Sequence, residues 1–279
     1  MSIYDYRAPS PALREYVKRY QILGCEFPVS MLELPIKAYW PRAENCLTFL
    51  PRDPEKIENN FDGNLIESTR SRLQGQYSIS RNIHVGRDFM VFNVVFQPGG
   101  LFRLTSIPLH ELTNTFADAE AIFSKEIKLV NERLSYTKYY TEMIDIIESF
   151  LQSLINKSKK QELPIDKVSR FLQANPNCAS MDWLANQACL SQRQFYRQFI
   201  ERQGISPKLY ARIARFENVM KAKNLNPSKG WPGIAYDFGY YDYQHMVKDF
   251  IEFTTITPTA FYNASARGPE VAFGMRETY

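Results

Sequence analysis

Cysteine is scarce in this sequence, and histidine is scarcer. The chain of 279 residues has four cysteines and three histidines. No two cysteines form a C-x-x-C pair, which argues against a zinc ribbon and against a disulfide-stapled domain. A metal centre in a β-barrel needs two or three histidines beside a carboxylate, and these three are spread over the chain. We therefore expect no metal and no cofactor.

Long apolar runs are missing as well. No stretch approaches 18 consecutive apolar residues, so we expect no membrane-spanning helix. The first residues, Met-Ser-Ile-Tyr-Asp-Tyr-Arg, lack the basic-then-apolar layout of a signal peptide. With 44% hydrophobic and 23% charged residues, the chain can bury real cores. We expect a cytoplasmic protein of roughly two domains.

Charge is distributed unevenly along the chain. Residues 1–163 carry 20 Lys+Arg and 20 Asp+Glu, whereas residues 165–267 carry 13 Lys+Arg and eight Asp+Glu. A basic C-terminal half favours a polyanionic partner such as nucleic acid, but a surplus of this size is also typical of an ordinary solvated surface.

The first 112 residues are expected to be mostly β-strand. Residues 46–50 and 87–96 are rich in β-branched and aromatic residues, and the second run stops at the turn signal Gln97-Pro-Gly-Gly100. Short strands broken by turns predict a small β-barrel or sandwich.

Helical patterns follow in residues 113–156. Residues 116–134 are rich in helix formers, and residues 138–155 repeat apolar residues three and four apart. This stripe comprises Met143, Ile147, Phe150, Leu151 and Leu154. It packs either on the protein's own β-domain or against a second copy as a dimer seam, and the pattern does not decide between them. Residues 157–164 are polar, charged and closed by proline, which is typical of a linker.

The sequence after residue 164 repeats itself at an offset of 51 residues. Phe199 corresponds to Phe250, and Pro207 corresponds to Pro258. A repeat of apolar positions indicates that one supersecondary unit is built twice. We assign residues 165–267 to this C-terminal domain and residues 268–279 to a tail.

Each copy has the pattern of a helix-turn-helix. In the first, Ser180 can cap a supporting helix, and Ser191 with Gln194 forms a capping box at the start of the second helix. In the second, Gly239 supplies the turn and Asp242 supplies the cap. The second helix of such a pair reads the major groove of DNA.

Side chains on the outer faces of these two helices are the candidates for DNA contact. Arginine can bind guanine in a bidentate way, glutamine can pair with adenine, and valine can contact a thymine methyl group. The candidate residues are Ser191, Arg193, Gln194, Tyr196, Arg197, Asp242, Tyr243, Gln244, Val247 and Lys248.

A long helix is expected between the copies. Ser206 and Pro207 form an N-cap and N1 pair, and a helix from there to Asn224 would span roughly 28 Å at about 1.5 Å per residue. That length is near the roughly 34–36 Å between successive major-groove faces. The helices that start at Ser191 and Asp242 are therefore expected to read two successive major grooves.

These residues resemble the AraC/XylS family of bacterial transcription regulators. The resemblance rests on Leu184-Ala185-x-x-Ala188-x-Leu190-Ser191-x-Arg193-x-Phe195-x-Arg197-x-Phe199, on Gly204-Ile205-Ser206-Pro207, and on Ile234-Ala235-Tyr236-Asp237-x-Gly239-Tyr240-x-Asp242. It implies an all-helical C-terminal domain that binds duplex DNA. Residues 94–103 and 107–112 resemble one group of this family, with a β-rich, cupin-like N-terminal domain. The expected fold class is a multidomain α+β protein.

Two departures from the family pattern concern the second copy. Thr255 stands where glycine is usual, and since a β-branched residue disfavours positive φ, we expect the end of that helix to differ. Lys248 replaces the commoner arginine, which leaves a point charge better suited to phosphate.

The resemblance also implies partners. We expect double-stranded promoter DNA and a homodimer, with RNA polymerase and a small-molecule effector as further candidates. An effector pocket among Tyr77, Phe92, Phe96 and Phe102 is one interpretation, and core packing explains these aromatics equally well.

Two other function classes stay open. One is a cupin-type metalloenzyme, for which the N-terminal half offers only His84 and His110 with Glu111, and these are more typical of ordinary surface or core histidines. The other is a protein-interaction adaptor with a degenerate helix-turn-helix domain, against which Arg193 and Arg197 argue. No catalytic residues are expected.

Overall fold

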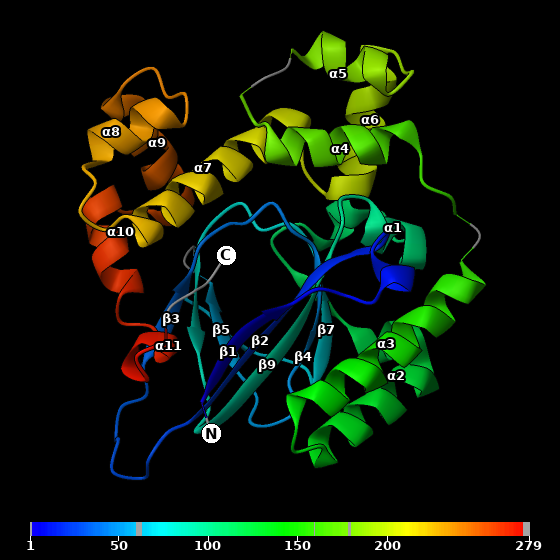
Figure 1. The fold of residues 1–279 in the computed structure, drawn as a ribbon, viewed down its shortest axis with the longest axis vertical. Helices are drawn as coiled ribbons and strands as arrows, with labels where there is room; N and C mark the ends of the chain where they lie inside the picture. Colours follow the sequence, from blue (N-terminus) through cyan, green and yellow to red (C-terminus); the bar gives the residue numbers. More distant parts are fainter. Residues whose placement is uncertain (1, 60–62, 159, 178–179, 276–279) are drawn as a thin grey trace.

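Two β-sheets face each other in the N-terminal part of the molecule (Figure 1). The computed structural model describes residues 2–59, 63–158, 160–177 and 180–275. One sheet has six strands in the order β1-β2-β9-β4-β7-β10, and the other has four in the order β3-β8-β5-β6. The strands are β1 (Ile3–Arg7), β2 (Val17–Glu26), β3 (Ile36–Tyr39), β4 (Cys46–Phe49), β5 (Lys56–Asn59), β6 (Leu65–Glu67), β7 (Ser71–Gln74), β8 (Arg81–His84), β9 (Asp88–Phe96) and β10 (Phe116–Asp118).

The central strand β9 separates two apolar layers. Because side chains alternate along a strand, Phe92 and Phe96 face a core beneath helices, whereas Phe89 and Val91 face the space between the sheets. The strands expected around residues 46–50 and 87–96 are present as β4 and β9.

Two helices cover the outer face of the six-stranded sheet. They are α2 (Ala119–Tyr136) and α3 (Tyr140–Lys157), preceded by α1 (Gly100–Thr105) and the short 3-10 helices η1 (Pro11–Leu13) and η2 (Leu109–Leu112). The apolar stripe of α3 is buried in the same core as α2 and the sheet, including Met143, Phe150 and Leu154. The stripe therefore packs on the protein's own domain, which is the first of the two interpretations that the sequence left open.

The sheet extends beyond the boundary expected at residue 112. Residues 116–118 form β10, which pairs with β7, although the sequence pattern placed a helix there. The helix begins only at Ala119, where the side chain of Asp118 accepts a hydrogen bond from the backbone N–H of Glu120. Because Asp118 caps the helix at this point, residues 116–118 stay outside it, although their composition favours a helix.

The C-terminal part of the chain is helical. Its helices are α4 (Pro164–Ala174), α5 (Met181–Gln187), α6 (Gln192–Gln203), α7 (Pro207–Leu225), α8 (Trp231–Asp237), α9 (Tyr243–Thr254), α10 (Pro258–Ser265) and α11 (Pro269–Ala272). The pair α5–α6 lies at one end of α7 and the pair α8–α9 at the other (Figure 1). This is the repeat that the sequence predicts, with a long helix between its copies. Within the described ranges, no helix combines the length and the apolar character that crossing a bilayer requires.

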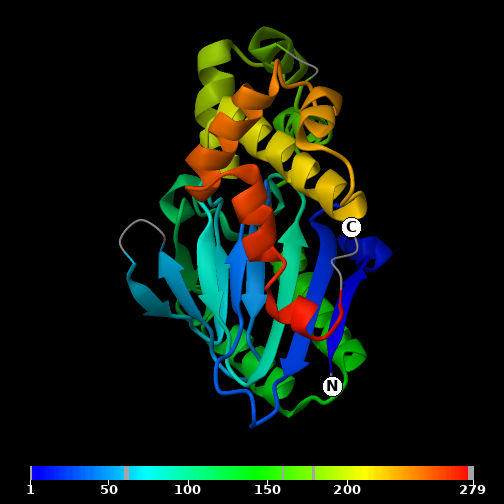
Figure 2. The same ribbon diagram turned by 90° about the vertical axis from the view of Figure 1, so that its left-hand side faces the viewer.

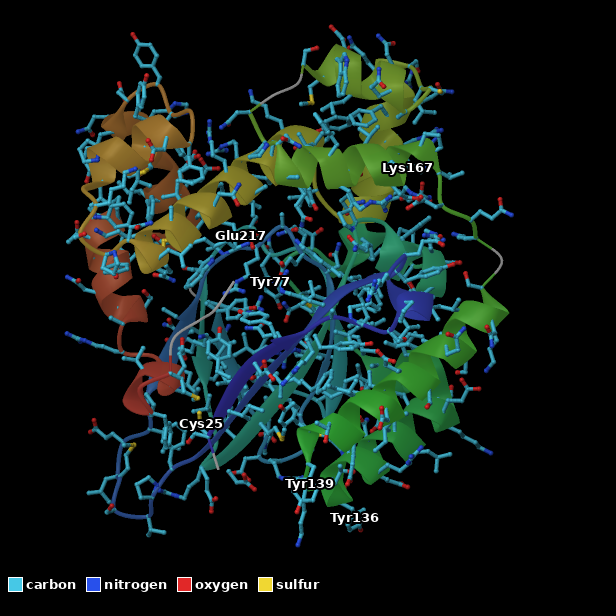
Figure 3. The ribbon with its side chains drawn as sticks, viewed as in Figure 1. Cys25, Tyr77, Tyr136, Tyr139, Lys167 and Glu217 are labelled. Carbon is cyan, nitrogen blue, oxygen red and sulfur yellow. The ribbon has the colours of Figure 1, made fainter. Side chains whose placement is uncertain are left out.

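The helical part rests on one end of the two sheets (Figure 2). The loop between β3 and β4 enters the helical part, since Trp40 and Ala43 are buried in its core. The backbone N–H of Ala43 donates to Glu217 Oε2 at 3.2 Å, and Tyr210 donates to the carbonyl of Ala43 at 3.2 Å. Figure 3 shows Glu217 on the side of α7 that faces the sheets.

The last helices return to the β-domain. α10 packs beside β3, and Glu270 in α11 pairs with Lys37 of that strand. Phe273 stacks on Phe27 with ring centroids 5.1 Å apart. The tail that we expected from residue 268 is thus part of the packed structure as far as residue 275.

Candidate nucleic-acid interface

Helix α6 is fixed at its start by the predicted capping box. The side chain of Ser191 accepts a hydrogen bond from the backbone N–H of Gln194, and Gln194 Oε1 accepts one from the backbone N–H of Ser191 at 3.0 Å. Phe195 and Phe199 face inward and are buried. Helix α6 is the second helix of the first pair, and α9 is that of the second pair; we refer to them below as the recognition helices.

The outer face of α6 presents polar side chains to solvent. Arg193, Gln194, Tyr196 and Arg197 are all exposed. Among the described residues, no side-chain hydrogen bond or ion pair involves Arg193, Tyr196 or Arg197. The fork-shaped donors of two arginines are therefore available to an external partner.

The inner end of α6 is held by a buried ion pair. Arg202 Nε and Nη2 donate to the two carboxylate oxygens of Asp166 in α4, at 2.8 and 2.7 Å. Both side chains are buried, and the guanidinium also lies over the ring of Phe102 at 4.7 Å. Such bidentate geometry fixes orientation as well as distance.

Helix α9 is also capped at its start and also presents polar side chains to solvent. Asp242 caps it by accepting a hydrogen bond from the backbone N–H of His245 at 2.7 Å. Met246 is buried on the inner face, whereas Gln244 and Lys248 are exposed. The remaining candidates, Tyr243 and Val247, are half-buried, so they offer less surface than the sequence predicts.

A buried carboxylate fixes α9 on the long helix α7. Asp249 accepts hydrogen bonds from Arg212 Nη2 at 2.7 Å, from Arg215 Nη2 at 3.2 Å and from the hydroxyl of Tyr240 at 2.9 Å. Burial and the neighbouring carboxylate raise the pKa of Tyr240, and hydrogen bonds to Glu252 and Asp249 raise the pKa of Arg212. Tyr240 therefore stays neutral and Arg212 stays charged over the physiological range.

The two recognition helices end in the same way, which corrects our expectation for Thr255. Gly204 after α6 has φ 93° and Thr255 after α9 has φ 67°, so both residues close their helix in the left-handed conformation. Thr255 donates from its N–H to the carbonyl of Ile251 at 2.9 Å. This closing hydrogen bond helps to offset the steric cost of positive φ for a β-branched residue, so the end of α9 does not differ as we expected.

Both helix ends also contact the β-domain. Thr113 Oγ1 donates to the carbonyl of Gly204 at 2.8 Å, and the backbone N–H of Ser80 donates to the carbonyl of Phe253 at 2.6 Å. The N-terminal turns of the recognition helices are exposed, while their C-terminal turns are docked. The β-domain thus holds both helices from behind.

The aromatics predicted to form an effector pocket do not gather in a cavity. Phe92, Phe96 and Phe102 are buried in the core between the six-stranded sheet and the helices. Tyr77 lies elsewhere, stacked on Arg81 with the guanidinium 3.5 Å from the ring centroid. Core packing, the other interpretation, therefore accounts for the three phenylalanines.

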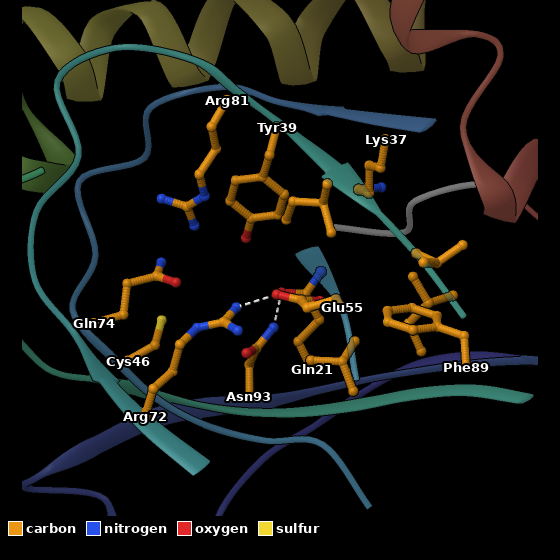
Figure 4. Close-up of a pocket in the computed structure, with 14 residues that line it drawn as sticks. Gln21, Lys37, Tyr39, Cys46, Glu55, Arg72, Gln74, Arg81, Phe89 and Asn93 are labelled. Carbon is orange, nitrogen blue, oxygen red and sulfur yellow. Dashed lines mark hydrogen bonds and ion pairs between the residues drawn. The ribbon is translucent and has the colours of Figure 1, made fainter. Parts of the chain in front are cut away.

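A cavity does exist on the opposite face of the sheet, between the two sheets (Figure 4). Its volume is about 30 Å³, and its wall includes Arg72, Gln74, Arg81 and Asn93. None of these residues was among the sequence-based pocket candidates, which were all aromatic. The signal that could have found them is a charged residue at an inward position of a strand, as in Ser71-Arg-Leu-Gln74.

Another missed feature is the exposed turn before α9. Tyr241 is 93% exposed, while its neighbour Tyr240 is buried, and Tyr236 on α8 is 84% exposed. These exposed rings lie near a recognition helix and are accessible to an external partner. Two consecutive tyrosines after Gly239 are the sequence signal, since only one of them can face the core.

The three histidines lie in separate places. His84 on β8 pairs with Glu58 at 3.1 Å, His110 belongs to η2, and His245 belongs to α9. In the part of the chain that the structure describes, no group of three or more His, Cys, Asp or Glu side chains is arranged to hold a metal ion.

Comparison with known protein families assigns both halves of the chain. Residues 184–264 match a helix-turn-helix domain family. Residues 6–118 match a domain of unknown function, DUF6597. A search of curated protein sequences found no match.

The fold is similar to those of two proteins with solved structures, ToxT and CuxR. ToxT from Vibrio cholerae is 12% identical, with a TM-score of 0.47 over 88% of this chain and 98% of its own. Wild-type ToxT from Vibrio cholerae strain SCE256, bound to an unsaturated fatty acid, is 10% identical, with a TM-score of 0.48 over 93% and 97%. The AraC-like transcriptional activator CuxR is 12% identical, with a TM-score of 0.26 over 78% and 86%. At these TM-scores, the likeness says nothing about ligands of this chain.

Proposed function

We propose that this chain is a DNA-binding transcription regulator of the AraC/XylS type and that it reads two successive major grooves with α6 and α9. The observation that carries this proposal is the difference between the exposed N-terminal part and the docked C-terminal end of each recognition helix. The outer face of the first two turns carries exposed polar side chains, and the C-terminal end of each helix accepts a hydrogen bond from the β-domain. A helix presented in this way can enter a groove without the domain behind it moving.

The length of α7 supports simultaneous reading. This helix has 19 residues, which corresponds to about 28 Å at 1.5 Å per residue. Successive major-groove faces lie roughly 34–36 Å apart. Because each recognition helix is fixed to α7 or α4 by a buried carboxylate, the spacing between the helices is set before DNA is bound.

The side chains of the interface have different roles in this proposal. Arg193, Arg197 and Gln244 reach base edges, and Lys248 contacts phosphate. Ser191 and Asp242 act on the backbone of their own helices as caps. Gln194 has its carbonyl oxygen committed to the capping box, which leaves only its amide group for DNA.

Paired alanine variants test this assignment in DNA-binding titrations across salt concentrations. Arg197→Ala should weaken binding to the preferred site by about 1–3 kcal/mol and relax the preference at one base pair. Lys248→Ala should weaken binding to all sequences alike and reduce the slope against salt by about one.

Lys128→Ala removes a charge from an exposed position of α2 and serves as the matched control. The control should bind like the unmodified protein. Unchanged base preference in Arg197→Ala would contradict the assignment of Arg197 on α6 to a base contact.

The homodimer, the RNA polymerase contact and the small-molecule effector are further predictions for this regulator. The stripe of α3 does not offer a seam for the dimer, because it lies in the protein's own core. Sedimentation of the full chain with and without DNA would test it, and a monomer in both conditions would contradict it.

A further inference from the structure

A side chain from the first half of the helical domain reaches the turn of the second helix-turn-helix pair. Asn177, in the loop between α4 and α5, donates from Nδ2 to the backbone carbonyl of Phe238 at 2.7 Å. Phe238 closes α8, so this carbonyl lies in the turn that leads into α9. In Figure 1 the chain that leaves α4 runs towards α8 and α9. Because the last carbonyls of a helix have no partner within it, the amide of Asn177 supplies one from the other half of the domain.

Gly239 leaves room for this contact. A Cβ atom on Gly239 would lie 2.7 Å from Nδ2 of Asn177 and 3.2 Å from its Cγ, so the amide would have to move. The conformation of the turn is a second reason for glycine, since its φ is 68°. In the first pair, however, the corresponding turn residue is Cys189, with φ 56°. The left-handed conformation thus tolerates a side chain at this point of the motif, and the close approach of Asn177 is what distinguishes the second turn.

The Asn177 contact differs from the other ties of the recognition helices. In the first half of the domain, Asp166 holds α4 to α6, and Phe171 of α4 packs on Trp183 of α5 with ring centroids 5.2 Å apart. In the second half, Asp249 holds α9 to α7. Each of those ties fixes a helix to its neighbour. The Asn177 contact acts between the two halves, because it joins the loop after α4 to the turn between α8 and α9.

We propose that Asn177 is a positioning residue that sets the separation and the angle of α6 relative to α9. The inference rests on the proposed function, because both helices must enter DNA for their spacing to matter. Two helices held in one arrangement before binding lose less conformational freedom on a duplex whose grooves match them. A duplex with a different groove spacing is bound only if the arrangement changes, which breaks the Asn177 contact. The chain therefore selects DNA by groove spacing as well as by base sequence.

DNA titrations with two duplexes test this role. One is the duplex that the unmodified chain selects from a random library. The other has one base pair inserted between the two contacted grooves, which displaces the second groove by about 3.4 Å. The measured quantity is the dissociation constant of the longer duplex divided by that of the selected one. Asn177→Ala should reduce this ratio by about 2–10-fold, the equivalent of one net hydrogen bond.

Further variants separate positioning from a general loss of affinity. Asn177→Asp keeps the shape but lacks the donor, so it should lower the ratio as Asn177→Ala does, while its charge weakens binding to both duplexes alike. Gly239→Ala should also lower the ratio, because its methyl group displaces the amide of Asn177. Two controls should keep the ratio: Cys189→Ala, at the corresponding turn of the first pair, and Asn156→Ala, at an exposed position of α3.

Thermal unfolding of the same chains tests the contact without DNA. Asn177→Ala should lower Tm by about 2–4 °C in the unmodified chain. In a chain that already carries Gly239→Ala it should leave Tm unchanged, because both substitutions remove the same hydrogen bond. Equal losses of Tm in the two backgrounds would refute the contact.

The two measurements distinguish the possible failures. An unchanged ratio in Asn177→Ala would refute the positioning role. If the unmodified chain selects no duplex while the losses of Tm are not additive, the proposed function is refuted and the contact stands.

Discussion

Glu44 shows how a single residue stays charged inside the protein. Burial would raise the pKa of this carboxyl, but Arg19 and Lys18 hold it at about 2. Arg19 Nη2 lies 2.5 Å from Glu44 Oε1, and Lys18 Nζ lies 3.8 Å from it. Because Glu44 follows Ala43, this charge cluster also supports the loop that meets α7.

The lowered pKa of Glu44 predicts a loss of stability in acid. A carboxyl whose folded pKa is about 2 and whose ordinary value is 4.5 stabilises the fold fully above pH 4.5, and this contribution is lost as the pH falls towards 2. The loss amounts to about 3 kcal/mol. Urea unfolding measured between pH 5 and pH 2.5 should show a shallower dependence in Glu44→Gln, while Glu142→Gln, at an exposed position, keeps the original slope. Identical slopes in both variants would contradict the assignment.

Helix ends decide how the recognition helices are presented. Each begins with a side-chain cap and finishes with a residue of positive φ, so its start and its end are fixed independently of its middle. At the end of α9 the residue is Thr255, whose β-branched side chain makes the left-handed conformation costly.

Replacing Thr255 by glycine should therefore stabilise the protein. Relief of the steric cost, less the extra chain entropy of glycine, predicts a gain of about 0.5–1 kcal/mol. Urea unfolding measures it. The same substitution at Thr259, in the first turn of α10, should lower stability instead, because glycine weakens a regular helix. A loss of stability in Thr255→Gly would show that the threonine side chain has a role beyond tolerating its φ.

At the scale of the whole molecule, the two halves share one packed boundary. Trp40 comes from the β-domain yet is 4% exposed within the helical core, edge-on to Phe261 with ring centroids 6.2 Å apart. Thr113 and Ser80 add hydrogen bonds to the ends of both recognition helices. Unfolding of one half therefore exposes surface of the other.

This boundary predicts a single unfolding transition in calorimetry. Trp40→Ala removes a buried aromatic side chain and should weaken the packing between the two halves by about 3–5 kcal/mol. We expect two separate transitions in this variant. Trp183→Ala changes a half-exposed tryptophan on α5 and should keep one transition. One transition in Trp40→Ala would mean that other contacts carry the coupling.

The sequence by itself determined the features that depend on residues a few positions apart. The capping box of Ser191 and Gln194, the cap at Asp242 and the turn at Gly239 are local hydrogen bonds and φ preferences, so they could be predicted without knowing the fold. The repeat itself revealed the paired units, because the same inward positions recur in each copy.

Only the tertiary structure decided what depends on distant neighbours. Phe92 of β9 and the apolar stripe of α3 are buried in one core, because the helices pack on this face of the six-stranded sheet. Their burial depends on how the sheet and the helices are stacked. Thr255 adopts a conformation that its residue type disfavours, because the closing hydrogen bond and the packed helix end outweigh the local preference. The cavity around Arg81 joins strands that are remote in sequence, and pattern reading has no access to such a meeting of side chains.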